Sequence, residues 1–211
     1  MFPKSIKQIS LAGSVWGTAL DEECECLYIE CRNEEDRTIF IARLNLKNLE
    51  LESRKVNITW WDKLVGVKLN QLYFVKYLDQ NDPTQQLSFI LDFESGVKAE
   101  WESSAEFSIH TRHPEIYEHG SDYFDIVSKF LALELPVSCE YLEWQNKIII
   151  SYYLRSANGF DRYLLLLKNG EKEWKVKQDQ EMKGFSSGAF FVFDNQLIFI
   201  KDRNEVCVYT G

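Results

Sequence analysis

The chain has 211 residues, of which 45% are hydrophobic and 14% aromatic, and its formal net charge is −9. This length allows a sizeable core, and the aromatic content favours strands. The acidic balance and scattered lysines predict that nucleic acid is not a partner, because backbone binding needs clustered Lys and Arg. A membrane partner is not expected either, because no apolar run approaches the roughly eighteen residues of a membrane span.

The first residues of the chain, 1–8, contain lysines but lack the apolar stretch of a secretory signal. The five cysteines show no spacing typical of a disulfide framework, which favours a reducing compartment. We therefore expect a cytoplasmic protein.

A short element occurs twice, as residues 70–76 (NQLYFVK) and 195–201 (NQLIFIK). Each copy is a turn-forming dipeptide followed by a β-branched and aromatic run that ends in lysine. Related runs occur at 26–30 and 146–153. Four copies of one element indicate a repeat fold.

Further apolar runs surround each copy and complete units of about 45 residues with four antiparallel strands, the period of a β-propeller blade. Candidate first strands cover 14–20, 64–69, 139–144 and 189–193. We predict an all-β, small four-bladed propeller-like domain spanning 1–211. Its expected blades are 12–57, 60–104, 136–180, and 184–211 together with 5–11.

The last unit lacks an outer strand, and residues 5–11 alternate like a strand without a unit of their own. Pairing the N-terminal segment with the strand near 205–210 would remove exposed edges. We therefore predict that the N-terminal strand completes the last blade.

Residues 105–135 form an insertion between the second and third blades. Within it, apolar residues at 123, 124, 127, 130 and 131 follow helical spacing, and a Ser or Asp at 121–122 can act as N-cap. A short amphipathic helix is predicted there.

The hairpins at 91–101 (LDFESGVKAEW) and 168–174 (KNGEKEW) share a glycine turn followed by a tryptophan. The glycines are expected to supply a positive φ, and Trp101 and Trp174 are expected to be structural. The succession of strands and turns along the chain resembles that of β-propeller repeat proteins. More loosely, it resembles a family of bacterial proteins of unknown function whose second blade has an aspartate, a small turn and a tryptophan. This resemblance implies a fold and no particular activity.

All three histidines, His110, His113 and His119, fall in the insertion, near Glu115 and Glu118. Such side chains can bind zinc or iron when three or four converge. However, the spacing matches no established motif, and a polar surface loop is the favoured interpretation. A metal site at these histidines is the alternative.

Cys24, Cys26 and Cys31 cluster near the first unit's second strand. Alternation places Cys24 and Cys26 on one face and Cys31 on the other. Core packing is the favoured role, because free cysteine behaves as a small hydrophobe. Redox or metal use is the lesser alternative.

Trp60 and Trp61 are adjacent, so one indole is expected to be buried and the other more exposed. An exposed Trp can anchor a partner or stack on a sugar, although packing of both between blades is the simpler interpretation. Trp60, Trp61 and Tyr117 are the partner-binding candidates.

Motifs for nucleophilic catalysis, phosphate binding and dinucleotide binding are absent from the sequence, so no cofactor is expected. Two functions remain open. The first is a non-enzymatic binding or scaffolding domain that uses one propeller face for a protein or small molecule. The second is a metal-dependent or hydrolytic enzyme with the histidine-containing insertion at the channel mouth.

Overall fold

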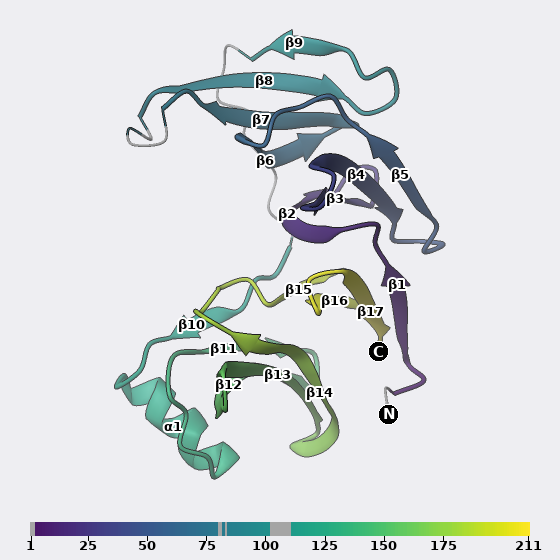
Figure 1. The fold of residues 1–211 in the computed structure, drawn as a ribbon. Helices are drawn as coiled ribbons and strands as arrows, with labels where there is room; N and C mark the ends of the chain where they lie inside the picture. The colour runs from purple at the N-terminus through teal and green to yellow at the C-terminus, as the bar shows by residue number, and fades with distance from the viewer. Residues whose placement is uncertain (1–2, 80–81, 83, 102–110) are drawn as a thin grey trace. The chain divides into compact units, whose positions relative to one another are not determined.

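The computed structural model describes residues 3–79, 82, 84–101 and 111–211 (Figure 1). The chain divides into two compact units. Unit 1 comprises residues 1–9 and 111–211, and unit 2 comprises residues 10–110. In the described part of the chain, no helix combines the length and apolar character needed to cross a membrane.

Unit 2 contains two antiparallel sheets in which each strand pairs with the next along the chain. The first sheet consists of β2 (Ser14–Asp21), β3 (Cys26–Asn33), β4 (Thr38–Asn45) and β5 (Leu51–Lys55). The second consists of β6 (Asp62–Lys68), β7 (Gln71–Tyr77), β8 (Gln86–Asp92) and β9 (Lys98–Glu100). This up-and-down order is that of a propeller blade.

Unit 1 contains the third and fourth sheets and the helix α1 (Asp122–Leu131). The third sheet consists of β10 (Glu115–Tyr117), β11 (Cys139–Trp144), β12 (Lys147–Ser156), β13 (Gly159–Lys168) and β14 (Glu171–Met182). The fourth consists of β15 (Phe190–Phe193), β16 (Gln196–Lys201), β17 (Glu205–Thr210) and β1 (Ile6–Ser10). The predicted all-β fold of four sheets with one helix is confirmed.

The repeated element forms an equivalent inner strand in each of the four sheets. Residues 71–76 lie in β7 and residues 196–201 form β16, and each of these strands lies between the strands that precede and follow it along the chain. The related runs lie in β3 and β12, which have the same position between their neighbours. The recurrence of this run in the sequence therefore predicts the position of each copy correctly.

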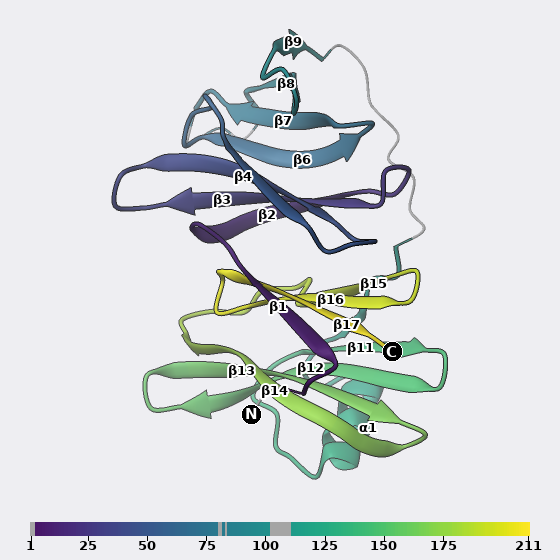
Figure 2. The same cartoon turned by 90° about the vertical axis from the view of Figure 1, so that its right-hand side faces the viewer.

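The N-terminal strand completes the fourth sheet. β1 lies beside β17 in the order β1-β17-β16-β15 (Figure 2), as predicted. Ile6 is buried in the core that the third and fourth sheets share. The edge of β17 is thereby covered, which removes an unpaired strand edge.

Apolar side chains fill the space between the two sheets within each unit. In unit 2, Tyr28 and Ile41 of the first sheet pack with Leu72 and Phe74 of the second. In unit 1, the corresponding core contains residues of β12, β13 and β14 on one side and of β15, β16 and β17 on the other. Burial of these faces stabilises each pair of sheets.

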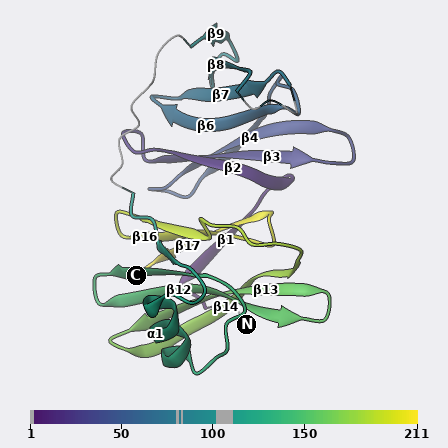
Figure 3. The ribbon, with the colours of Figure 1, turned by 90° about the vertical axis from the view of Figure 1, so that its left-hand side faces the viewer.

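The helix predicted in the insertion is confirmed. Ser121 is its N-cap and accepts a hydrogen bond from the Phe124 N–H at 3.3 Å, and Ala132 ends it in a left-handed conformation with φ 53°. Phe124 and Val127 pack on the third sheet, on the face opposite its shared core. Figure 3 shows α1 beside the strands of this sheet.

One part of the insertion differs from the prediction. Residues 115–117 were expected to lie outside the blades, but they form β10 and pair with β11, so the third sheet has five strands. Three residues after a proline are too short for alternation to reveal a strand.

Glycines supply the positive φ in the two hairpin turns where the sequence predicts it. Gly96 has φ 71° and Gly170 has φ 82°, as the two hairpins predict. Gly159, with φ 155°, begins β13 where a Cβ would collide with the Met182 carbonyl oxygen. Only glycine fits this close approach of two strands.

Candidate functional site

The turns at one end of unit 2 gather polar side chains from both of its sheets. In an up-and-down sheet the first and third turns lie at the same end. This end therefore carries the β2–β3 and β4–β5 turns of the first sheet and the β6–β7 and β8–β9 turns of the second. We call it the turn end of unit 2.

Arg43, on β4, is the centre of the turn end. Its guanidinium donates to Glu52 Oε2 at 2.6 Å and to Glu94 Oε1 at 2.5 Å, and one Nη lies 3.4 Å from Asn70 Oδ1. It also lies 4.7 Å from the ring centroid of Phe93. Two carboxylates thus neutralise its charge and fix its orientation.

Burial alone would lower the pKa of Arg43, but hydrogen bonding with Tyr28, Glu94 and Glu52 raises it above its ordinary value. The guanidinium therefore stays charged. Its positive charge is held within the ion-pair network, because both carboxylates contact it directly.

Asn70 is held in place by the first sheet. Its N–H donates to Asp21 Oδ2 at 3.0 Å, and its side-chain oxygen accepts a hydrogen bond from the Tyr28 hydroxyl. The other oxygen of the buried Asp21 accepts from the Cys24 N–H at 3.2 Å. Asn70 has φ 64°, a left-handed conformation that Asn tolerates in two-residue hairpin turns.

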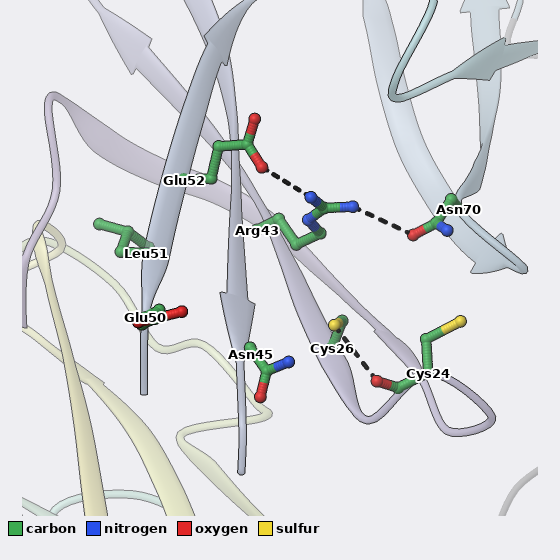
Figure 4. A pocket seen from close by; sticks show the side chains of 8 residues that line it. All are labelled: Cys24, Cys26, Arg43, Asn45, Glu50, Leu51, Glu52 and Asn70. Atoms are coloured by element: carbon green, nitrogen blue, oxygen red, sulfur yellow. Dashed lines mark hydrogen bonds and ion pairs between the residues drawn. The ribbon is translucent and has the colours of Figure 1, made fainter. Parts of the chain in front are cut away.

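A cavity of about 630 Å³ opens at the turn end (Figure 4). This volume lies within the range of small-molecule sites, roughly 300–1,000 Å³. The residues that line it are Cys24, Cys26, Arg43, Asn45, Glu50, Leu51, Glu52 and Asn70. Except for Leu51 and the two thiols, all are charged or carry an amide, so the cavity suits a polar ligand.

The carboxylates give the cavity an acidic character. Glu50 is exposed and accepts one hydrogen bond, from Asn48 Nδ2 at 2.8 Å. Glu52 is ionised, because hydrogen bonds from Arg54 and Arg43 outweigh its slight burial and lower its pKa. Arg43 and Arg54 both pair with Glu52 and with Glu94, which balances these four charges, so Glu50 adds a net negative charge to the lining.

The thiols of the cavity are not activated. Burial and the negative charge of Asp21 raise the pKa of Cys24 to about 11, and burial also raises the pKa of Cys26. The Cys26 thiol donates to the Cys24 carbonyl oxygen at 3.3 Å. Both are protonated near neutral pH, and a thiol in that state is a poor nucleophile and metal ligand.

Cys31 lies away from the cavity, buried on the other face of β3, as alternation predicts. Burial, with the charge of Glu30, raises its pKa to about 12. All five cysteines are free thiols.

The tryptophan pair lies at the opposite end of unit 2. Trp60 is partly buried and packs edge-on against Trp16, with ring centroids 5.6 Å apart, while Trp61 is 51% exposed. Trp60 is therefore the less exposed indole of the pair and Trp61 the more exposed one. Trp101 packs against Tyr73, with ring centroids 5.0 Å apart, and Trp174 is buried in the core of unit 1.

The described histidines contact different elements. The ring of His113 lies 6.0 Å from that of Phe191, and the ring of His119 lies 4.9 Å from that of Phe124, both between centroids. His110 lies outside the described residues. Among residues that the structure describes, no three His, Cys, Asp or Glu side chains are grouped as metal ligands would be.

Tyr117, the third partner-binding candidate, is half-buried on β10. It stacks on Tyr123 of α1 and on Tyr141 of β11, with ring centroids 5.2 and 5.6 Å apart. The three rings form a continuous aromatic surface beside the helix. The sequence did not predict this stack, because its rings come from three separate elements.

Several carboxylates are buried, although charged side chains usually lie at the surface. Glu30 is paired with Arg32, and its second oxygen accepts from the Leu64 N–H at 3.0 Å. In unit 1, Glu140 accepts from the N–H groups of Gly188 and Ala189 at 2.5 and 3.1 Å. Glu30 thus joins the first sheet to β6 of the second, and Glu140 joins the third sheet to the segment just before β15 of the fourth. Both glutamates have a structural role.

No family model matches the chain, and a search of curated proteins finds no match. Several solved structures are similar to it, including the following two. The β-propeller domain of the Trilobed protease from Pyrococcus furiosus is 13% identical with a TM-score of 0.31, over 94% of this chain and 56% of that one. Pyrococcus horikoshii acylaminoacyl peptidase is 12% identical with a TM-score of 0.25, over 94% of this chain and 38% of that one. The chain thus spans less than two thirds of either.

Proposed function

We propose that this chain is a non-enzymatic binding domain whose ligand site is the cavity at the turn end of unit 2. The observation that carries the proposal is the fixed polar lining, in which Arg43 and Asn70 are held by hydrogen bonds from both sheets. A lining that is ordered before binding loses little side-chain entropy when a ligand arrives.

The chemical character of the lining favours a small cationic or neutral polar ligand. Glu50 is an exposed carboxylate of the lining, whereas the charges of Arg43 and Arg54 are compensated by Glu52 and Glu94. The neighbouring β2–β3 turn adds the acidic residues 22 and 23, while Glu25 of the same turn is paired with Lys47. An amine or guanidine matches these acceptors, whereas a phosphate would meet repulsion.

A binding role is also supported by the absence of an activated group in this lining. The raised pKa values of Cys24 and Cys26 leave both thiols protonated near neutral pH. Catalytic groups usually have a pKa shifted towards the working pH. The five free cysteines support our further proposal of a reducing, cytoplasmic location.

Nuclear magnetic resonance tests the site directly. The ¹⁵N-labelled chain is titrated with putrescine and arginine amide, and separately with inorganic phosphate and citrate. We expect the amide signals of Cys24, Cys26 and Asn70 to shift with the amine and the guanidine and to stay unchanged with the anions. Shifts with the anions alone, or shifts confined to unit 1, would refute the proposed site.

The alternative, an enzyme that uses the histidines of the insertion, has a separate test. Elemental analysis of the purified chain is expected to show no stoichiometric transition metal. A bound metal that is lost in the His113→Ala variant would overturn the binding proposal in favour of a metal-dependent activity.

A further inference from the structure

Helix α1 exposes apolar side chains beside the face that it buries. Phe124 and Val127 pack on the third sheet, but Tyr123, Ile126 and Phe130 are 64%, 60% and 56% exposed. At about 100° per residue, these three side chains lie within an arc of roughly 60° on the helix. They form one stripe along its flank.

The tyrosine stack extends this stripe onto the sheet. Tyr123 stacks on Tyr117, which stacks on Tyr141 of β11, so helix flank and sheet present one apolar surface. We call Tyr117, Tyr123, Ile126, Phe130 and Tyr141 the α1 surface. Contiguous exposed apolar side chains rimmed by polar ones are typical of interaction sites.

Acidic side chains surround the α1 surface. Asp122 and Asp125 lie exposed on α1 itself, and Lys129 is the single basic residue in the helix. The Tyr117 hydroxyl donates to Glu115 at 3.2 Å, and the Tyr141 hydroxyl donates to Glu143 at 2.7 Å. A partner therefore meets apolar anchors within a negatively charged rim.

The charge and size of this surface together select its occupant. A second copy of the chain would bring two acidic rims together, which opposes self-association. The ten residues of α1 span only about 15 Å, which is the length of about three turns of a partner helix. A single amphipathic helix with basic flanks fits both the length and the charge.

We infer that the α1 surface binds a basic amphipathic helix of a partner protein. The apolar face of the partner helix packs on Ile126, Phe130 and the tyrosine stack. Its Lys or Arg side chains lie near Asp122, Asp125, Glu115 and Glu143.

The test uses a fluorescein-labelled fourteen-residue helix of leucine and lysine and an analogue with glutamate in place of lysine. Fluorescence anisotropy with the full chain is expected to detect the basic peptide and not the acidic one. The double variant Ile126→Ser, Phe130→Ser should bind at least about tenfold more weakly, because central apolar anchors dominate such interfaces. Circular dichroism confirms that the variant is folded.

Leu87→Ser, on β8 of unit 2, is the matched control, because Leu87 is 56% exposed and lies outside the α1 surface. It should bind the basic peptide like the original chain. Equal affinity of the double variant and the control would overturn the inference. So would comparable binding of the acidic peptide, or a dimer of the chain that the double variant abolishes.

Discussion

The Nε of Arg32 donates to Oε1 of Glu30 at 2.6 Å, and both side chains are buried within unit 2. The guanidinium also donates to the carbonyl oxygens of Trp60 at 2.5 Å and of Asp62 at 2.7 Å, and it lies over the rings of Trp16 and Trp60. Arg32 thus joins the first sheet to the segment that begins the second.

Glu30→Gln removes the charge that compensates Arg32 while keeping the shape of the side chain. We expect it to lower the free energy of unfolding by about 3–5 kcal/mol, because an unpaired buried charge remains. Urea unfolding near neutral pH measures this. Glu25→Gln, which breaks an exposed pair with Lys47 at 3.0 Å, should cost no more than about 1 kcal/mol. Similar losses in both variants would show that the Glu30–Arg32 pair has no special structural role.

Ile6→Ala tests the closure of the fourth sheet by β1. Ile6 is buried in the core of unit 1, so its truncation should cost about 2–5 kcal/mol. The adjacent Lys7 is exposed, and Lys7→Ala should change stability by less than about 0.5 kcal/mol. Chemical unfolding compares the two. An Ile6→Ala chain as stable as Lys7→Ala would mean that β1 does not dock in solution.

The pH dependence of stability should differ in sign between two carboxylates. Burial raises the pKa of Glu140 against the lowering effects of the Gly188 and Ala189 N–H groups and of Arg162. Its stabilising contribution is therefore fully present below the pKa of the unfolded chain and is lost as pH rises through the folded-state pKa. Hydrogen bonds from the Ser95 hydroxyl and N–H lower the pKa of Asp92, so its contribution is lost as pH falls.

Urea unfolding of Glu140→Gln and Asp92→Asn between about pH 3 and pH 7 measures this contrast. The stability difference between the original chain and Glu140→Gln should shrink as pH rises, and that for Asp92→Asn should grow. Burial also raises the pKa of Asp179. Because Asp179 is present in the original chain and in both variants, its effect cancels in each stability difference, which then reports the substituted group alone. Slopes of the same sign would contradict the assignment.

Thiol labelling tests the inactive character of the cavity cysteines. With a pKa of about 11, Cys24 should have about one thousandth of its thiol ionised at about pH 8, compared with about a quarter for a free cysteine. We expect Cys24 to react with iodoacetamide roughly a hundredfold more slowly than free cysteine. Labelling of all five thiols should require denaturant. Rapid labelling of Cys24 in the folded chain would instead indicate an activated nucleophile.

The strands and the helix were predictable because their signals are local. Short runs of consecutive β-branched and aromatic residues in 70–76 and 195–201 mark buried strands, and the spacing of Phe124 and Val127 marks a helix. The closing strand followed from counting strands in the last unit. β10 escaped prediction because three residues are too few to show a period.

The buried carboxylates and the cavity were not predictable, because they depend on residues far apart in the chain. Glu140 is buried only because the segment at Gly188 folds against it, and Arg43 meets Glu94 only through the packing of two sheets. A partial signal exists in β3, where Glu30 and Arg32 interrupt an otherwise apolar run. Charges two residues apart on one strand face within such a run indicate a buried pair.

Calorimetric titration with arginine amide is the most direct test of the proposed binding site. The original chain and Glu171→Gln, which removes an exposed glutamate in unit 1, should bind the probe with equal affinity. Glu50→Gln should bind it about three- to fivefold more weakly, because one acceptor charge of the cavity is lost. Identical affinities in all three proteins, or no binding to the original chain, would contradict a cationic-ligand site at the turn end of unit 2.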